Sequence, residues 1–425
     1  MNENHDRKSD RLTASRARIL KAAGEVFLEI GFERTSVDQI AAVARMSKQS
    51  IYELFPNKQA LFEAAVRDAL DMGRSRLAFV EPSTNVEQTL SEFGEGLFRG
   101  FADAVNFGLF RASIVAATHF PELADELHED RIARSRKLAD YLETLMDNGT
   151  LQQADPLLTA SRFGGLAVQG SRYFLGTPLP AEIARQAIVR SAIELFLHGY
   201  AGMAEIDDMD LANLTDAPLP PAIESKVAVR LSPEKVQRLM DAVLAEFLEH
   251  GFPAAKINRA ASAAQSSTAT VYRHFSSKEN LLRHVVEREI HTTSQVTLQA
   301  DLAGDAQTAL AALARQVLDW HLMPQNIALH RLLIQESDLV PDLAARFYDV
   351  RVAVAGRALT SLLETHGLPK PNSAAIRAFY VLATFAARFM TLTTVPEPAQ
   401  RDSYSGECAR LFLRGLAMPP LREDR

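Results

Sequence analysis

Apolar residues recur at helical spacing along almost the whole chain. Ile19, Ala23 and Phe27 follow one another at intervals of four residues, and Leu239 and Val243 show the same spacing far downstream. This period places apolar side chains on one face of an α-helix, whereas the period of two that indicates strands is scarce. The pattern predicts an all-α protein.

The pattern occurs twice. A shift of 220 positions superimposes residues 22–62 on residues 242–282 without a gap, and 13 of the 41 aligned positions are identical. Chance at typical residue frequencies would give about three identities. The register continues downstream, where Pro121 falls on Pro341. The simplest interpretation is two full-length copies of one unit.

Composition excludes several classes of protein. The net charge is -7 and the isoelectric point is near 5.9, so any surface for nucleic acid must be local. The single cysteine, Cys408, excludes a disulfide framework and a cysteine-based zinc site. The N-terminus lacks the apolar region of a signal peptide, and the most apolar later segment, residues 378–387, is about half a membrane span. We expect a cytoplasmic protein without a membrane segment.

Residues 36–58 of the first copy have the pattern of a helix-turn-helix. Ser36 and Gln39 have the spacing of a capping box at the start of a short helix. Ser47 is a candidate N-cap for a second short helix, which Pro56 ends. Two short helices joined by a tight turn share an apolar seam. We expect this seam to consist of Ile40, Ala41, Ala44, Ile51 and Phe55.

The outward polar residues are those that a duplex requires of a recognition helix. Lys48 can meet a phosphate or a guanine edge, and Gln49 can bond an adenine edge in two places. Helix N-terminal amides and neighbouring hydroxyls can hold phosphate oxygens. A solvated Lys58 and a half-buried Tyr52 remain as alternatives. We expect DNA contacts from Thr35, Ser36, Ser47, Lys48, Gln49, Ser50, Tyr52 and Lys58.

At these residues the chain resembles the DNA-binding domain of tetracycline-repressor (TetR) family transcriptional regulators. The resemblance runs from Ile19 to Leu61 and includes Gly31-Phe32, Thr35-Ser36 and Ser47-Lys48. It implies a three-helix DNA-binding unit followed by a helical domain that binds a small effector and dimerises through its last two helices. The implied dimerisation helices lie near residues 156–175 and 181–199, and near 372–392 and 403–416.

Repeat and resemblance together predict five segments. Residues 203–225 hold six acidic residues and no basic one, and residues 217–221 are rich in proline, which is typical of a solvated, partly stiff linker. The predicted order is a first helix-turn-helix domain (11–70), a first helical effector and dimerisation domain (71–202), an acidic, proline-rich linker (203–231), a second, divergent helix-turn-helix domain (232–290) and a second helical effector and dimerisation domain (291–420).

The second copy departs from the motif. Ala255 and Lys256 replace the Thr-Ser pair, which removes the cap, although Lys256 can itself meet a phosphate. Thr268 replaces the lysine, so a contact to a thymine methyl is expected instead of a guanine contact. Ser276 and Glu279 have capping-box spacing at the next helix. We interpret this copy as a second DNA-binding motif, or reader, that binds DNA more weakly than the first and recognises a different sequence. Its expected DNA contacts are Lys256, Ser267, Thr268, Thr270, Tyr272, His274 and Lys278.

The turn of each helix-turn-helix carries a bulky residue where the family often has glycine. These residues are Arg45 and Gln265. A positive φ at either position costs roughly 1 kcal/mol.

The effector domains offer weaker signals. His321, His330 and the other histidines lack the spacing of metal ligands within one helix, so we predict no metal and no cofactor. Arg111 and Arg331, one in each copy, are expected in structural ion pairs rather than on an anionic effector. Aromatic residues at helical spacing are usually core, but they can line an apolar pocket. The candidates are Phe93, Phe110, Phe163, Phe174, Trp320, Phe347, Phe379 and Phe389.

The leading hypothesis is a sequence-specific, ligand-responsive transcriptional regulator, a repressor by the family's habit. Its two copies pair within one chain as a pseudo-dimer on double-stranded operator DNA, or like copies pair across a homodimer. The alternative is a ligand-sensing or protein-interaction module whose second helix-turn-helix no longer binds DNA, because Ala255 removes a hydroxyl and Ala260 and Ser266 thin its apolar seam. No nucleophile elbow, phosphate loop or zinc-helix motif indicates an enzyme.

Overall fold

The computed structural model describes residues 3–74, 83–203, 232–299, 304–385 and 388–418. Over these residues the elements are helices, with one isolated bridge between Leu151 and Ala417, so the all-α prediction is confirmed. The predicted linker lies outside the described residues except for Met203. Among the described residues, those of the stretch Ser373–Thr391 are apolar enough over its length to cross a membrane, but they are mostly buried, as in a core helix.

The chain forms two compact units. The described part of the first unit comprises residues 3–74, 96–134 and 391–393, and the second takes the remaining described residues. Helices α5 (Val86–Ala102) and α7 (Pro121–Asp147) each contribute to both units. The second unit therefore contains the second copy and the end of the first.

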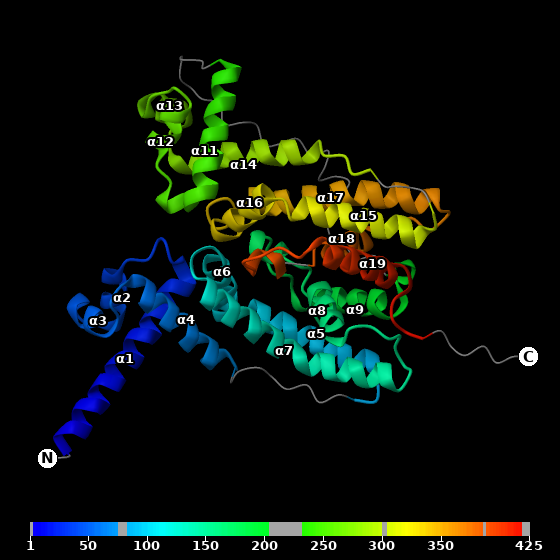
Figure 1. The fold of residues 1–425 in the computed structure, drawn as a ribbon, viewed down its shortest axis with the longest axis horizontal. Helices are drawn as coiled ribbons and strands as arrows, with labels where there is room; N and C mark the ends of the chain where they lie inside the picture. The colour runs from blue at the N-terminus through cyan, green and yellow to red at the C-terminus, as the bar shows by residue number, and fades with distance from the viewer. Residues whose placement is uncertain (1–2, 75–82, 204–231, 300–303, 386–387, 419–425) are drawn as a thin grey trace, which may run out of the picture. The chain divides into compact units, whose positions relative to one another are not determined.

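The first unit is built around α1 (Glu3–Ile30), which packs against α2, α4 and α6 (Figure 1). Its core includes four phenylalanine rings, one each from α1 and α4, one from the turn after α1 and one from the junction between α6 and α7. Phe62 lies 5.2 Å from Phe27 and 4.8 Å from Phe32 between ring centroids, and Phe120 lies 5.4 Å from both Phe32 and Phe62. The other helices of this unit are α2 (Val37–Ala44), α3 (Lys48–Leu54), α4 (Lys58–Arg74) and α6 (Ala104–His119).

The second unit repeats this order and adds the last helices of the first copy. Its helix-turn-helix packs α11 against α12 and α14, and α14 packs along α17. The elements from the first copy are α8 (Pro156–Ala167), η1 (Arg172–Leu175), α9 (Glu182–His198) and η2 (Tyr200–Gly202). Those from the second copy are α11 (Pro233–Ala254), α12 (Ile257–Ala263), α13 (Thr268–Phe275), α14 (Lys278–Ser294), α15 (Ala306–His321), α16 (Pro324–Gln335), α17 (Pro341–Thr365), α18 (Ser373–Ala383), η3 (Arg388–Thr391) and α19 (Pro398–Arg414).

Within the second unit, the last two helices of the first copy pack against the last two of the second. Helix α8 contacts α18, and α9 contacts both α18 and α19. At the ends of α9 and α19 the backbones approach so closely that a Cβ on Gly415 would lie 2.3 Å from the Leu197 carbonyl. The rings of Tyr200 and Phe412 stack at 4.7 Å between centroids, and the Leu416 amide donates to the Phe196 carbonyl at 2.9 Å. We call α8, α9, α18 and α19 the four-helix interface.

Candidate functional site

The first helix-turn-helix forms as the sequence predicts. The Ser36 hydroxyl accepts from the Gln39 amide at 3.2 Å, and the Gln39 side chain accepts from the Ser36 amide at 2.7 Å, which completes the capping box. Ser47 caps the recognition helix α3 by accepting from the Ser50 amide at 3.0 Å. All five seam residues are buried, namely Ile40, Ala41, Ala44, Ile51 and Phe55.

The turn between the two short helices has the backbone conformation expected from its position. Arg45 and Gln265 each adopt φ of 51°, in the left-handed region that favours glycine. Both side chains are exposed, so neither gains packing energy in return. The positive φ considered for this turn is present in both copies.

Helix α3 presents an exposed polar face. The side chain of Lys48 is 47% exposed, and Tyr52 is 43% exposed, so the half-buried alternative for Tyr52 is wrong. The Lys48 ammonium lies 2.8 Å from the Asp38 carboxylate, and this hydrogen bond raises the pKa of Lys48. Gln49 donates to Glu53 at 3.3 Å. A phosphate or base edge that meets Lys48 therefore competes with an acidic neighbour.

Two of the expected DNA contacts have other partners in the structure. Thr35 is 3% exposed, and its hydroxyl donates to the Gly31 carbonyl at 2.7 Å, so its side chain does not reach the surface. Lys58 is half-buried, with its ammonium 4.5 Å from the centre of the Phe32 ring and 3.4 Å from the Glu33 carbonyl. The solvated interpretation of Lys58 is therefore wrong, because its ammonium holds the loop before α2, and this role competes with the expected phosphate contact.

Lys278 repeats this arrangement in the second copy. Its ammonium donates to the carbonyls of Ala255 at 2.8 Å and Pro253 at 3.2 Å, and it lies 4.9 Å from the centre of the Phe252 ring. Burial lowers the pKa of both lysines, Lys58 and Lys278. The occurrence of lysine at this position in both copies is therefore explained by the loop carbonyls that Lys58 and Lys278 each bind.

The second helix-turn-helix keeps the burial pattern of the first. Ser267 caps α13 by accepting from the Thr270 amide at 3.1 Å, and Tyr272 is 39% exposed. Thr268 is half-buried. The capping box expected at Ser276 is wrong, because Ser277 is the N-cap of α14 and accepts from the Asn280 amide at 3.1 Å.

A carboxylate from the preceding helix binds the backbone amide of Lys256, the N-cap residue of α12, which makes no side-chain cap of its own. The Glu246 carboxylate is nearly buried and accepts from the Lys256 amide at 2.6 Å and from the Arg259 guanidinium at 2.8 Å. Burial alone would raise the pKa of Glu246, but these hydrogen bonds outweigh it and lower the pKa. The sequence comparison missed this contact because Glu246 stands ten residues upstream of Lys256.

The two motifs differ in charge. Residues 36–57 contain two basic and two acidic residues and are formally neutral, whereas residues 256–277 contain Lys256, Arg259 and Arg273 and no acid, a formal charge of +3. Glu246, outside this segment, pairs with Arg259. The exposed Arg273 occupies the position of Glu53 in the first copy. Arg259 and Arg273 were missed as candidates, although comparing charges at aligned positions would have found them.

His274 lies at the edge of this surface. It is half-buried, with its ring 4.5 Å from the Phe275 ring. Burial lowers its pKa, so the imidazole is neutral at pH 7 in the protein alone.

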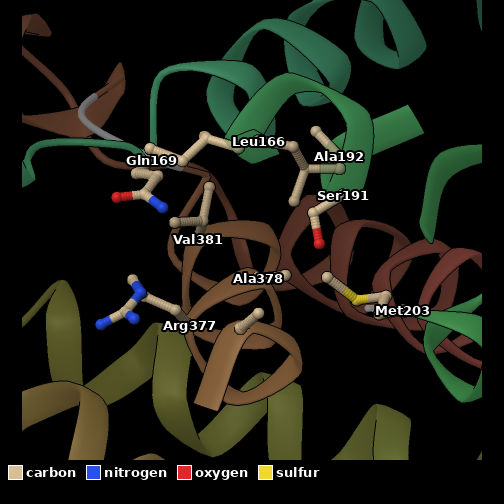
Figure 2. A pocket seen from close by; sticks show the side chains of 10 residues that line it. Leu166, Gln169, Ser191, Ala192, Met203, Arg377, Ala378 and Val381 are labelled. Atoms are coloured by element: carbon tan, nitrogen blue, oxygen red, sulfur yellow. The ribbon is translucent and has the colours of Figure 1, made fainter. Parts of the chain in front are cut away.

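A cavity of about 20 Å³ lies within the four-helix interface, lined by residues of both copies (Figure 2). Gln169 and Ser191 come from the first copy, and Arg377 and Ala378 from the second (Figure 2). The remaining lining residues are Leu166, Ile188, Ala192, Met203, Ala374 and Val381.

The aromatic residues proposed for an effector pocket do not line this cavity. Phe163 packs on Phe196 at 5.1 Å and Phe379 on Phe412 at 5.4 Å, so both belong to the core of the four-helix interface. The remaining six candidates lie elsewhere: Phe174, Trp320, Phe347 and Phe389 are buried, and Phe93 and Phe110 are half-buried.

The two arginines expected in structural ion pairs contact neighbouring groups of their own copies. Arg331 donates from Nε to the Met390 carbonyl at 2.9 Å, and the Arg111 guanidinium lies 5.1 Å from the centre of the Phe107 ring. Their ion pairs stay a prediction.

Two family profiles match the chain, each twice. The profile described as "Bacterial regulatory proteins, tetR family" matches residues 19–65 and 239–285. The profile described as "AefR-like transcriptional repressor, C-terminal domain" matches residues 88–202 and 308–415. Together the matches cover more than half of the chain, in the tandem order that the repeat predicts.

Individual relatives match one copy at a time. RutR of Escherichia coli K12, an HTH-type transcriptional regulator, is 38% identical over 154 residues, which are 35% of this chain and 70% of RutR. The uncharacterized HTH-type regulator Rv1556 of Mycobacterium tuberculosis H37Rv is 30% identical over 128 residues, 30% of this chain, so the match spans 60% of that relative's length. The solved structure of the Flavonoid-responsive Regulator FrrA is 27% identical, with a TM-score of 0.36 over 43% of this chain and 94% of FrrA.

Proposed function

Because this chain belongs to the TetR family of bacterial transcriptional regulators, we propose that it is a ligand-responsive repressor whose two copies act as a pseudo-dimer within one chain. Its coarser activity, regulation of transcription through DNA binding, follows from the family. In the proposal each copy reads one half of an asymmetric operator in the cytoplasm. Small-molecule binding changes the geometry of the two readers.

The observation that carries the proposal is an asymmetric ion pair in the four-helix interface. Arg162 of the first copy lies 2.5 Å from Glu407 of the second, and the Arg162 side chain is 4% exposed. Aligning the helix ends, at Val168 with Thr384 and at Gly199 with Gly415, relates the two copies here by a shift of 216 positions.

At that shift Ala378 corresponds to Arg162 and Ser191 to Glu407. Pairing two first copies or two second copies would leave Arg162 or Glu407 without its opposite charge. Unpaired buried charges are strongly disfavoured, so the interface favours unlike copies.

The proposal includes a working second reader. The +3 charge of residues 256–277 supports phosphate binding, since each neutralised phosphate adds to the salt-dependent part of DNA affinity. Different side chains on the two recognition helices, Lys48-Gln49 against Thr268-Ala269, support two unlike half-sites.

Ion pairs within each copy support a route from effector domain to reader. In the first copy Arg67 on α4 lies 2.7 Å from Glu126 on α7. In the second, Arg283 on α14 lies 2.7 Å from Asp342 on α17. Helices α4 and α14 directly follow the two recognition helices, so a movement of α7 or α17 is passed to a reader. An effector shifts this equilibrium only by its difference in affinity for the two states.

The test is a selection of bound duplexes from a random pool at fixed salt, with light scattering to count chains on the recovered site. We expect two dissimilar half-sites bound by one chain. A palindrome bound by two chains would contradict the intrachain pseudo-dimer. Protection of one half-site only would favour the alternative, in which the second helix-turn-helix has lost DNA binding.

A further inference from the structure

The effector domain of the second copy contains a buried polar cluster without enough partners. Arg351 on α17 is 0% exposed, and its Nε donates to the Tyr380 hydroxyl at 3.1 Å. Neither Nη1 nor Nη2 of this guanidinium has a hydrogen-bond partner. A buried cation whose N–H groups lack acceptors is strongly unfavourable, so this group is arranged for an anion.

Two histidines face the same cluster. His321 on α15 and His330 on α16 are 2% and 1% exposed, with 5.3 Å between their ring centroids. Both ring nitrogens of His321 and Nδ1 of His330 have no partner, and Nε2 of His330 lies 3.4 Å from the Ser171 hydroxyl. Burial, and the charge of Arg351, keep the pKa of both imidazoles low, so each offers one N–H donor at pH 7.

Aromatic rings surround the guanidinium. Its central carbon lies 3.9 Å from the Trp320 ring centroid and 5.4 Å from that of Phe347. No group of three or more His, Cys, Asp or Glu side chains with metal-binding geometry occurs in the described part of the chain. The cluster therefore combines a forked cationic donor, neutral donors and apolar ring surface.

We propose that Arg351, His321 and His330 form a binding site for the carboxylate group of a small organic acid. A guanidinium whose two Nη groups have no hydrogen-bond partner can donate to the two oxygens of a carboxylate. The aromatic rings suit an apolar body on that carboxylate better than a strongly hydrated inorganic anion. The site names the ligand class for the proposed regulator, and only its effect on DNA rests on that proposed function.

The first copy lacks this chemistry. At the shift of 220, His321 corresponds to Phe101, His330 to Phe110 and Trp320 to Gly100, whereas Arg351 corresponds to Arg131. Arg131 donates to the Thr391 hydroxyl. The chain therefore carries one such site, in its second copy.

The site is placed to act on both copies of the second unit. Arg351 shares α17 with Asp342, which binds Arg283 on α14. Tyr348, also on α17, donates to the Gln169 carbonyl of the first copy at 3.2 Å, and Ser171 comes from that copy as well. A carboxylate bound to Arg351 can therefore shift α17, which contacts α14 of the second reader and also contacts the first copy at the four-helix interface.

The test uses the fluorescence of Trp320, the only tryptophan in the chain. The full-length protein is titrated with acetate, isobutyrate and benzoate at constant chloride, and separately with inorganic phosphate. We expect a saturable change with carboxylates, tightest for those with an apolar body. Saturation by phosphate alone, or by no anion, would overturn the carboxylate site.

Two variants and a control assign the response. Arg351→Met should weaken carboxylate binding at least tenfold and should raise the melting temperature in anion-free buffer, because it removes an uncompensated buried charge. His321→Phe with His330→Phe, which installs the residues of the first copy, should also weaken binding and keeps the test valid if the arginine variant does not fold. Arg131→Met should leave the titration unchanged. Equal binding by wild type and both variants would contradict the assignment.

A separate readout distinguishes this site from the proposed function. Affinity for the selected duplex is measured on the same samples with and without carboxylate. A fluorescence response without a change in DNA affinity supports the site and contradicts the proposed ligand response. Release from DNA by a carboxylate that leaves Trp320 unaffected contradicts the site alone.

Discussion

Arg162 and Glu407 join the two copies through a nearly buried ion pair that has no counterpart at the equivalent place. The corresponding residues, Ala378 and Ser191, line the interface cavity instead (Figure 2). Gln169, which corresponds to Phe385 near the Arg162 guanidinium, lines it too. The interface has therefore diverged on its two sides, with charge on one and small side chains on the other.

Reversing one charge of this pair should destabilise the second unit. Glu407→Arg places two guanidiniums together and should lower the free energy of unfolding by about 3 kcal/mol, the scale of a broken buried pair. The double variant Arg162→Glu with Glu407→Arg should recover most of the loss. Urea denaturation of the full chain measures both, with Ser191→Ala as the control. Additive effects in the double variant would mean that the pair does not interact.

Substitutions at Lys48 and at Asp38 should change the affinity for DNA in opposite directions. Lys48→Ala should lower affinity for the first half-site by about tenfold and, if it meets a phosphate, reduce the salt slope by about one unit. Asp38→Asn, which introduces the residue type of Asn258, should raise affinity because it frees the ammonium. Fluorescence anisotropy on the selected duplex at several salt concentrations is the measurement. Thr268→Ala, at the aligned position of the other reader, is the control. If Lys48→Ala changes neither the affinity nor the salt slope, Lys48 does not contact DNA.

Relief of strain at the two turns should stabilise the helix-turn-helix domains. Arg45→Gly and Gln265→Gly should each raise the free energy of unfolding by about 0.5–1 kcal/mol, since glycine adopts a φ of 51° without the Cβ penalty. Arg45→Gln is the control, because it removes the charge and keeps the Cβ. Thermal unfolding that ranks the control equal to the glycine variant would attribute the effect to charge.

The two loop-holding lysines should matter for stability and not for the salt slope. Lys278→Met removes two hydrogen bonds to carbonyls and should cost about 1–2 kcal/mol, whereas Lys58→Met removes one long hydrogen bond and should cost less. Chemical denaturation ranks the two variants. A salt slope that falls by a full unit in either variant would show a phosphate contact instead.

Stability should fall as the pH drops below about 6.5, the ordinary pKa of histidine in an unfolded chain. Burial lowers the pKa of His330 to about 3 and that of His321 well below its usual value. Below pH 6.5 the unfolded state therefore binds protons that the folded state does not bind. Each histidine contributes a loss of about 1.4 kcal/mol per pH unit between the two pKa values. Urea midpoints from pH 7.5 to 5 should show a shallower slope in the His321→Phe with His330→Phe variant. His291→Gln, at an exposed position, is the control.

Sequence alone predicted the local features of the DNA-binding motif. The capping box at Ser36, the cap at Ser47 and the positive φ at Arg45 depend on residues within a few positions of one another, and periodicity and propensity report such short-range relations well. The repeat also predicted the positive φ at Gln265 in the second copy.

Only the tertiary structure decided the roles of residues whose partners are far away in the chain. It buried Thr35, placed the Glu246 carboxylate on the Lys256 amide and placed Lys58 and Lys278 on loop carbonyls. It also brought Arg162 to Glu407, 245 positions away.

The buried cluster at Arg351 gives the same lesson. His321, His330 and Arg351 come from three different helices, and no spacing within one helix connects them. Short-range order is encoded in neighbouring residues, whereas a site assembled across helices depends on which faces pack together. The sequence therefore determined the family, the repeat and the reader helices, and packing decided which charges are paired, buried or left for a ligand.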